Sequence, residues 1–420
     1  MKVLWFSITP VFFNDQDAGK GGAGWISALE RVVARDNDIQ LYVAYLTTDI
    51  NKGKETKGNI THIPMVRQSR KIDRLRCLFT DRYSNEETVK KSLEIIDAVS
   101  PDLIQVFGSE WCFGLVAQYQ NIPVVVHMQG FWNEYLNSSF LPGQSRLSEF
   151  VRQFPRNLRF QFLEYRKRIQ RAEMEKTIMQ KNRYFMGRTR WDQAIVRLYN
   201  PFAKYYLVNE ALRDDIVNSQ CIWGCESRKL YTFATLGTCQ TLKGHDVILK
   251  TAYLLKKHSN ISFRWLLIGA SSKELKAFEQ FTKIRAKDVN VKPCGRMNAK
   301  QVTDILGNTD IYIHPSYADN SPNAVCEAQF LGVPIIATNV GGIPSLFSDT
   351  YDKDLLVPTN DPYYLASKII ELAPDLERKR KLSALNIELS HSRHDDVHIL
   401  SALKKAYVDI IRDANHSSQH

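Results

Sequence analysis

Apolar and polar residues follow two alternating patterns along the chain. Short runs rich in β-branched and aromatic residues are typical of buried strands, and stretches between them have helical spacing, as at Ile26–Val33, Val247–Lys257 and Ala299–Leu306. In the first half, strands are predicted at Val3–Ile8, Ile39–Leu46, Leu103–Phe107, Val124–His127, Tyr184–Met186 and Tyr205–Leu207. In the second half, they are predicted at Tyr231–Leu236, Phe263–Ile268, Val289–Lys292, Ile311–His314 and Ile335–Ala337. Strands that alternate with helices indicate βαβ units and parallel sheets.

Two such series in one chain predict two doubly wound α/β domains. A chain of 420 residues is also too long for one ordinary core. We expect an N-terminal Rossmann-like domain over 1–213, a C-terminal one over 231–394 and a joint in the stretch around 214–230. Residues 395–420 begin with an amphipathic pattern and predict a C-terminal helix. Ligands of such sheets bind at the carboxyl ends of the strands, so we expect the site in a cleft between the domains.

A basic segment at about residues 145–180 departs from this alternation. It is helical and aromatic, and it predicts an insertion in the N-terminal domain. Residues 146–190 hold 13 Lys and Arg against four Glu, residues 67–82 form a second basic segment, and the net charge is +11. Such charge is typical of proteins that meet a lipid surface, a phosphorylated substrate or nucleic acid, although a solvated helix face explains it equally well.

Other features of the sequence narrow the class of protein. No apolar run approaches the ~18 residues that a membrane span needs. The apolar N-terminus is broken at Thr9-Pro10, which favours a buried first strand over a signal peptide. The seven cysteines are scattered, which indicates reduced thiols in a cytoplasmic protein. No obvious cluster of metal ligands is present in the sequence, and we expect neither a metal nor another cofactor.

The most informative stretch combines a strand, a loop and a short helix. After the predicted strand Ile311–His314, Ser321 suits the N-cap of a helix and Pro322 its first position, where the missing N–H costs nothing. Ala324–Leu331 then predicts a short buried helix. A strand that leads through a loop into a helix is a common frame for ligand sites in α/β proteins.

Polar groups gather around the start of this predicted helix. The free N–H groups of Asn323 and Ala324 predict an anion site, because a helix N-terminus carries about half a positive charge. Asp319 in the loop and Glu327 on the helix can flank one ligand from two sides. Carboxylates accept hydrogen bonds well from sugar and ribose hydroxyls.

Two glycine-rich stretches give weaker signals. Lys243, in the segment Leu236–Gly244, is placed between a strand and a helix to meet a phosphate as a point charge, although an exposed lysine is the simpler interpretation. Gly19–Trp25 matches the G-x-G-x-x-G pattern, but it begins about ten residues after the first strand, which disfavours a dinucleotide site. Its glycines instead predict a close approach of the backbone to a ligand.

Together these segments resemble the family 4 glycosyltransferases, which have the GT-B fold of two Rossmann-like domains facing across a cleft. The resemblance covers most of the chain: a first strand, a glycine-rich loop, a Gly-x6-Gly segment with Lys before its last Gly, and a Pro-Ser loop followed by paired acids. The acid pair and the run from Gly332 to Thr338 are the most specific parts. In this fold a C-terminal helix often returns to the first domain, so we expect residues 395–420 to pack there.

The resemblance implies roles for the matching positions. Lys243 would contact the donor diphosphate, Glu327 would hold the donor ribose and Asp319 would lie near the donor sugar; with His127 these are the candidate catalytic residues. The donor-binding set is Gly21, Gly22, Gly237, Thr238, Lys243, Arg296, Met297, Asp319, Asn320, Asn323, Ala324 and Glu327, and the acceptor-side set is Gln129 and Arg188.

Three positions depart from the family's pattern. Asp319 stands where a glutamate is usual and is one methylene shorter. Thr238 stands where an arginine usually supports the leaving phosphate, and Gln129 where a histidine is usual. Arg188 and Arg296 are candidates to supply the missing cation. Loss of one oxyanion donor costs about 2.7–4 kcal/mol of transition-state stabilisation, so a catalytically inert nucleotide-binding homologue is an alternative.

The resemblance implies a retaining transfer of a sugar from a UDP- or GDP-linked donor to a glycan or lipid-linked acceptor, without a protein nucleophile or a metal, in cell-surface polysaccharide synthesis. The acceptor would lie on the N-terminal domain, and the basic insertion predicts a peripheral position at the anionic inner membrane face. A sugar-nucleotide epimerase of the same fold is a second alternative. A dinucleotide-dependent oxidoreductase is disfavoured by the displaced glycine loop. Only the charge favours nucleic-acid binding, and without a recognisable module we expect no nucleic-acid partner.

Overall fold

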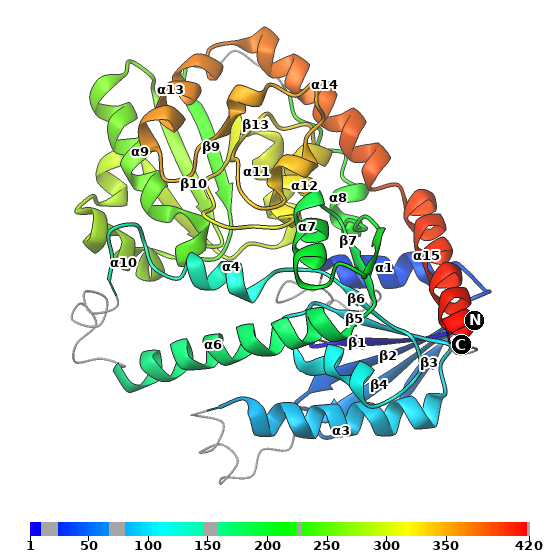
Figure 1. The fold of residues 1–420 in the computed structure, drawn as a ribbon. Helices are drawn as coiled ribbons and strands as arrows, with labels where there is room; N and C mark the ends of the chain where they lie inside the picture. Colours follow the sequence, from blue (N-terminus) through cyan, green and yellow to red (C-terminus); the bar gives the residue numbers. More distant parts are fainter. Residues whose placement is uncertain (10–23, 67–79, 146–157, 225–228, 418–420) are drawn as a thin grey trace. The chain divides into compact units, whose positions relative to one another are not determined.

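The computed structural model describes residues 1–9, 24–66, 80–145, 158–224 and 229–417. Internal contacts divide the chain into two units, each built around one sheet (Figure 1). Unit 1 comprises Met1–Asn137, Gln144–Ala211 and His394–His420, and unit 2 comprises Ser138–Gly143 and Leu212–Arg393. The C-terminal segment therefore belongs to the same compact unit as the N-terminal half.

Unit 1 is an α/β unit with an eight-stranded sheet. Its strands are β1 (Lys2–Ser7), β2 (Gln40–Thr47), β3 (Glu55–Lys57), β4 (Ile60–Val66), β5 (Leu103–Phe107), β6 (Val124–His127), β7 (Tyr184–Gly187) and β8 (Lys204–Leu207). Its helices are α1 (Gly24–Val33), α3 (Arg82–Val99), η1 (Cys112–Gln118), α4 (Trp132–Asn137), α6 (Leu158–Lys181), α7 (Arg190–Tyr199) and α15 (Asp396–Ser417). The strand order is β3-β4-β2-β1-β5-β6-β7-β8, and among these described strands only the β3–β4 pair is antiparallel.

Strand β1 shows why this sheet is buried on both faces. Val3 and Trp5 pack with α1 and α15 in one apolar cluster, whereas Leu4 and Phe6 pack with α3 and η1 in another. Successive side chains of a strand point to opposite faces, so a central parallel strand needs an unbroken apolar run. This requirement explains the sequence at the N-terminus and its assignment to a strand.

Unit 2 is a second α/β unit, and its six strands are all parallel. They are β9 (Tyr231–Leu236), β10 (Phe263–Ile268), β11 (Val291–Gly295), β12 (Ile311–His314), β13 (Ile335–Thr338) and β14 (Leu356–Val357), in the order β11-β10-β9-β12-β13-β14. Its helices are α8 (Asp214–Val217), η2 (Thr241–Lys243), α9 (His245–His258), α10 (Ser272–Thr282), η3 (Ala286–Val289), α11 (Ala299–Gly307), α12 (Asn323–Phe330), η4 (Ile343–Leu346), η5 (Lys353–Leu355), α13 (Pro362–Leu372) and α14 (Leu376–Arg393).

The structure confirms the two parallel-sheet α/β architecture and corrects some of its details. The strand predicted at Val289–Lys292 was wrong at its start, because Val289 ends η3 and Asn290 has a left-handed φ of 59° that separates it from β11. Strands β3, β4 and β14 were not predicted. The short strands β3 and β14 lie at sheet edges and lack a long apolar run, so their sequences resemble loops.

The basic segment predicted as an insertion contains α6, while residues 146–157 lie outside the described part of the chain. Arg171 Nη2 lies 2.6 Å and Lys167 Nζ 3.5 Å from the carboxylate of Asp81, just before α3. Part of the positive charge of α6 is therefore paired inside unit 1, whereas Arg166 and Arg168 are exposed. Of the helices described, none combines the length and apolar character that crossing a membrane requires.

Candidate functional site

The strand order of unit 2 singles out one position for a ligand. From β9 the chain builds β10 and β11 on one side, then returns to place β12 on the other side of β9. At such a switch point the loops that leave adjacent strands diverge, and open parallel sheets bind ligands there, at the carboxyl ends. The loops in question are those after β9, which contains Gly237 and leads to Lys243, and after β12, which contains Asp319.

Close backbone contacts hold these two loops together. The N–H of Tyr317 donates to the carbonyl of Leu242 at 2.7 Å. Gly244 has a φ of 68°, and a Cβ there would lie 1.9 Å from the carbonyl oxygen of Pro315. Only glycine fits this position without strain, because it needs a left-handed backbone and lets the second loop pass against it. The glycine next to Lys243 therefore fixes where the lysine sits.

Lys243 and Asp319 form an ion pair at this edge of the sheet. Lys243 Nζ lies 2.5 Å from Asp319 Oδ2, and both side chains are largely buried. The same oxygen lies 3.0 Å from His314 Nε2 and accepts from Ser316 Oγ at 3.3 Å. Burial raises the pKa of the Asp319 carboxyl, but Lys243 and His314 outweigh this effect and hold the pKa below its ordinary value. Asp319 is thus a charged group with fixed partners.

A pair of adjacent glycines shapes the backbone at Asp319. Gly341 has a φ of 54°, and a Cβ there would lie 1.9 Å from the carbonyl oxygen of Asp319. The N–H of Gly342 donates to that same oxygen at 3.0 Å. The Gly-Gly turn after β13 therefore packs against the backbone carbonyl of Asp319 and fixes its position, a role that the sequence did not indicate.

Glu327, on the buried side of α12, is held by an arginine that was not among the predicted site residues. Arg213 donates to Glu327 Oε1 from Nε at 3.0 Å and from Nη2 at 2.6 Å. Burial raises the pKa of Glu327, and Arg213 counteracts it. Arg213 precedes the short helix α8, more than a hundred positions from Glu327, so no local pattern could have linked the two.

The start of α12 differs from its prediction but keeps an anion-binding character. Ser321 is not the N-cap; Pro322 is, with an extended backbone, and its carbonyl accepts from the N–H groups of Val325 and Cys326 at 2.9 and 3.2 Å. Within the described residues, the N–H groups of Asn323 and Ala324 have no such acceptor. Free first-turn amides and the helix dipole together favour a bound anion.

The remaining donor-side positions surround these groups or lie at the ends of neighbouring strands. Asn320 is buried in the loop after β12, while Thr238 is exposed just after β9. Arg296 and Met297 follow β11, and Arg296 is exposed. Gly21 and Gly22 lie outside the described residues.

The acceptor-side positions belong to unit 1 and lie around the ends of β6 and β7. Arg188 is buried, forms an ion pair with Glu210, and has its guanidinium 4.9 Å from the centre of the Trp25 ring. His127 is fully buried between Trp25 and Phe107. Burial and the charge of Arg188 lower the pKa of His127 to about 3, so its imidazole is neutral. Gln129 is partly exposed after β6.

Two carboxyl groups near these residues, those of Glu175 and Glu110, were not predicted from the sequence. Glu175 Oε1 accepts from Ser109 Oγ at 2.8 Å, and its Oε2 accepts from the side chain of Asn133 at 3.1 Å. Burial and the nearby charge of Glu110 raise the pKa of Glu175 to about 7. The pKa of Glu110 is raised as well, chiefly by burial. Glu175 lies within the basic run of α6, so its surroundings in the sequence resemble a solvated helix face.

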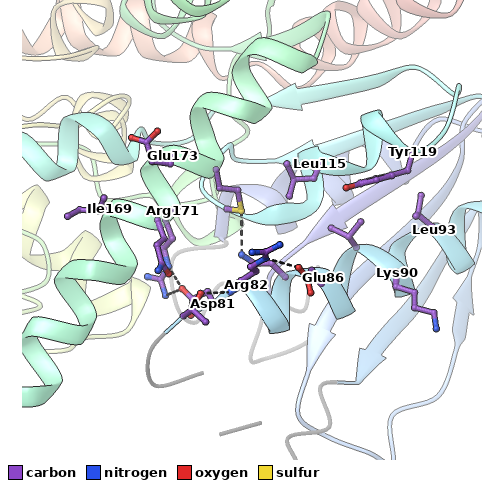
Figure 2. A pocket seen from close by; sticks show the side chains of 15 residues that line it. Asp81, Arg82, Glu86, Lys90, Leu93, Leu115, Tyr119, Ile169, Arg171 and Glu173 are labelled. Atoms are coloured by element: carbon purple, nitrogen blue, oxygen red, sulfur yellow. Dashed lines mark hydrogen bonds and ion pairs between the residues drawn. The ribbon is translucent and has the colours of Figure 1, made fainter. Parts of the chain in front are cut away.

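Unit 1 also contains a cavity of about 660 Å³, between α3, η1 and α6. Figure 2 shows apolar side chains such as Leu93, Leu115 and Ile169 along it, and the contact of Asp81 with Arg171 at one end. Its charged lining residues are Asp81, Arg82, Glu86, Lys90, Arg171 and Glu173. Acids and bases are equal in number, so the lining does not select a ligand by charge.

Comparison with known proteins finds a family match within unit 2. Residues 230–375 match the family model of the group 1 glycosyl transferases. The chain is 29% identical over 188 residues to a D-inositol 3-phosphate glycosyltransferase of Corynebacterium kroppenstedtii, covering 44% of this chain and 41% of that protein. It is 28% identical over 153 residues to the putative colanic acid biosynthesis glycosyltransferase WcaL of Escherichia coli, covering 33% of this chain and 37% of that protein. These matches span about two fifths of the relatives' lengths.

Solved structures with similar folds cover nearly the whole chain. A sucrose-phosphate synthase from Thermosynechococcus elongatus superposes with a TM-score of 0.70 at 15% identity, over 98% of this chain and 99% of that one. Anabaena Alr3699/HepE, in complex with UDP and glucose, superposes with a TM-score of 0.61 at 12% identity, over 96% and 98% of the two chains. These similar structures show the GT-B fold. Over residues 230–375 the chain is also similar to the group 1 glycosyl transferases.

Proposed function

We propose that this protein transfers a sugar, with retention, from a UDP- or GDP-linked donor to a glycan or lipid-linked acceptor. The observation that carries the proposal is the cation–acid pair of Lys243 and Asp319 at the switch point of unit 2, next to the free amides of α12. This arrangement offers fixed positive charge for a diphosphate and fixed acceptors for sugar hydroxyls.

Each group has a separate task in the proposed reaction. The bond between the anomeric carbon and the donor's diphosphate oxygen breaks, and a bond to the acceptor oxygen forms as that oxygen passes its proton to the departing diphosphate. Negative charge grows on the departing diphosphate, where Lys243 and the N–H groups of Asn323 and Ala324 stabilise it. Glu327 accepts from the ribose hydroxyls while Arg213 keeps it oriented. The positive charge comes from the lysine and the amides, so the proposed scheme uses no metal.

The acceptor side of the proposal rests on unit 1. Gln129, Arg188 and the carboxyl groups of Glu110 and Glu175 provide polar groups near the carboxyl ends of its strands, where an acceptor's hydroxyls can bind. The exposed bases of α6, among them Arg166 and Arg168, favour a peripheral position at the inner face of the membrane. Anionic vesicles at low salt should retain the protein, and failure to bind them would remove the membrane from the proposal.

The relatives support a role in cell-surface polysaccharide synthesis. WcaL is named for colanic acid biosynthesis, and the HepE structure is titled as a complex with UDP and glucose. We therefore propose a nucleotide-sugar donor and a surface glycan product for this chain.

Thermal unfolding with a panel of nucleotides and nucleotide sugars tests the donor site. A ligand at a hundredfold excess over its Kd adds about 2.7 kcal/mol of stability, which raises the midpoint by several degrees. We expect one donor class to stabilise the wild type and to stabilise Lys243→Ala and Glu327→Ala clearly less. If no nucleotide shifts the wild type, the donor assignment is wrong.

A catalytically inert nucleotide-binding protein is the second candidate, because Thr238 stands where the resemblance implies an arginine and Arg296 is exposed after β11. The two functions differ in one measurement. Release of nucleoside diphosphate from the donor identified by thermal unfolding, in the presence of an acceptor extract, favours the transferase. Stabilisation without release under these conditions favours the inert protein.

A further inference from the structure

A buried series of hydrogen bonds leads from strand β12 to Lys243. The hydroxyl of Tyr312 lies 3.2 Å from His314 Nδ1, and His314 Nε2 lies 3.0 Å from Asp319 Oδ2. That oxygen in turn meets the ammonium group of Lys243. Tyr312 and His314 are 0% and 2% exposed, so neither side chain can exchange these partners for water.

The protonation states give the series a direction. Burial lowers the pKa of His314, which is therefore neutral and carries one ring proton. Burial raises the pKa of Tyr312, which keeps its hydroxyl proton and donates it to Nδ1. The single imidazole proton is then on Nε2, which faces both Asp319 Oδ2 and Ser316 Oγ at 3.0 Å, and Ser316 Oγ in turn donates to the same carboxylate oxygen.

Asp319 is well suited to be held in this way. Its side chain is one methylene shorter than the glutamate that the resemblance implies, and its Oδ2 meets donors from Lys243, His314 and Ser316. An oxygen with three donors from three positions has little freedom to move. The ammonium group that it pairs with is thereby placed at the carboxyl ends of β9 and β12.

We propose that His314 is a positioning residue, which holds Asp319 and through it places Lys243 for the diphosphate of the donor. The inference rests on the proposed function, because it concerns the group that Lys243 is proposed to bind. His314 need not touch the ligand. Its effect on nucleotide binding should therefore vanish when Lys243 is absent.

A double-mutant cycle tests this coupling, with calorimetric titration of UDP, GDP and ADP at fixed salt. His314→Asn removes the Nε2 donor, and His314→Gln retains an N–H group near the position of Nε2. We expect His314→Asn to weaken binding of the preferred diphosphate about tenfold in the wild type and to change it less than twofold in Lys243→Ala. His314→Gln should restore most of the affinity. Equal losses in both backgrounds, or no loss in the wild type, would overturn the positioning role.

A measurement without nucleotide separates this inference from the proposed function. At pH 8 Asp319 is ionised and His314 is neutral, because the pKa of each is held below its ordinary value. The fall in urea midpoint caused by His314→Asn at this pH should therefore be larger with Asp319 present than in Asp319→Asn, because the lost hydrogen bond needs both partners. Equal falls in both backgrounds would contradict the coupling, whether or not any nucleotide binds.

Discussion

Glu175 is a buried carboxyl group whose charge changes around neutral pH. Its pKa of about 7 lies above the ordinary value, so between roughly pH 5 and pH 7 the folded protein binds a proton that the unfolded chain releases. The free energy of unfolding must fall as pH rises through this window. This loss of stability is the free-energy cost of ionising a buried side chain, which also links α6 to Ser109 and Asn133 by hydrogen bonds.

Glu175→Gln should remove this cost, because the amide keeps one acceptor and one donor in place of the protonated acid. We expect the variant to be more stable than the wild type at pH 8, by up to about 3 kcal/mol, and little changed at pH 5. Thermal unfolding at the two pH values measures the difference. Glu173→Gln, an exposed position on the same helix, is the matched control. A gain of equal size at both pH values would show that the effect is not titration.

At the scale of elements, one glycine decides whether the two loops of the donor site can meet. Gly244→Ala introduces a Cβ 1.9 Å from Pro315 O at a φ of 68°, and Gly58→Ala has a similar φ of 57° with no atom within 4 Å. The second variant measures the backbone cost alone, about 1–2 kcal/mol. We expect Gly244→Ala to cost clearly more in denaturant unfolding and to abolish nucleotide stabilisation, because the loops must separate. Equal costs would mean that the close approach is unimportant.

The elements also show what the sequence could and could not predict. Strands buried on both faces, such as β5, β9 and β12, were predicted to the residue because their apolar runs are continuous. Strand β4 contains polar residues and Pro64 and was missed. Lys243 and Asp319 were both chosen as site residues, but 76 positions separate them, and only the topology of the sheet could show that they pair. Arg213 and His314 carried no local signal at all.

At the scale of the whole molecule, the last helix of the chain completes the core of unit 1. Leu403, Tyr407 and Ile410 of α15 share one apolar cluster with Trp5 and Trp25. Strand β1 and helix α15 therefore depend on each other for their burial, although all of unit 2 lies between them in the sequence. Because burial of these apolar side chains stabilises the cluster, α15 is part of the core of unit 1.

Polar contacts make this dependence specific and testable. Tyr407 accepts from Trp5 Nε1 at 2.9 Å and donates to Gln105 Oε1 at 2.5 Å, and Gln105 Nε2 lies 3.2 Å from His127 Nδ1. Tyr407→Phe keeps the packing but leaves a buried indole N–H and an amide oxygen without this partner, which should cost about 1–3 kcal/mol. Val408→Ala, a half-exposed neighbour on α15, is the control.

Hydrogen exchange should show which elements lose stability in Tyr407→Phe. If unit 1 unfolds as a unit of its own, Tyr407→Phe will speed exchange in β1, β5 and α1 and leave β9, β12 and α12 unchanged, because local stability follows the contacts that support it. Nucleotide binding at Lys243 should then be unaffected. Faster exchange to the same degree in both units would instead mean that the chain unfolds as one cooperative body, in which a tyrosine on the last helix supports the donor site as well.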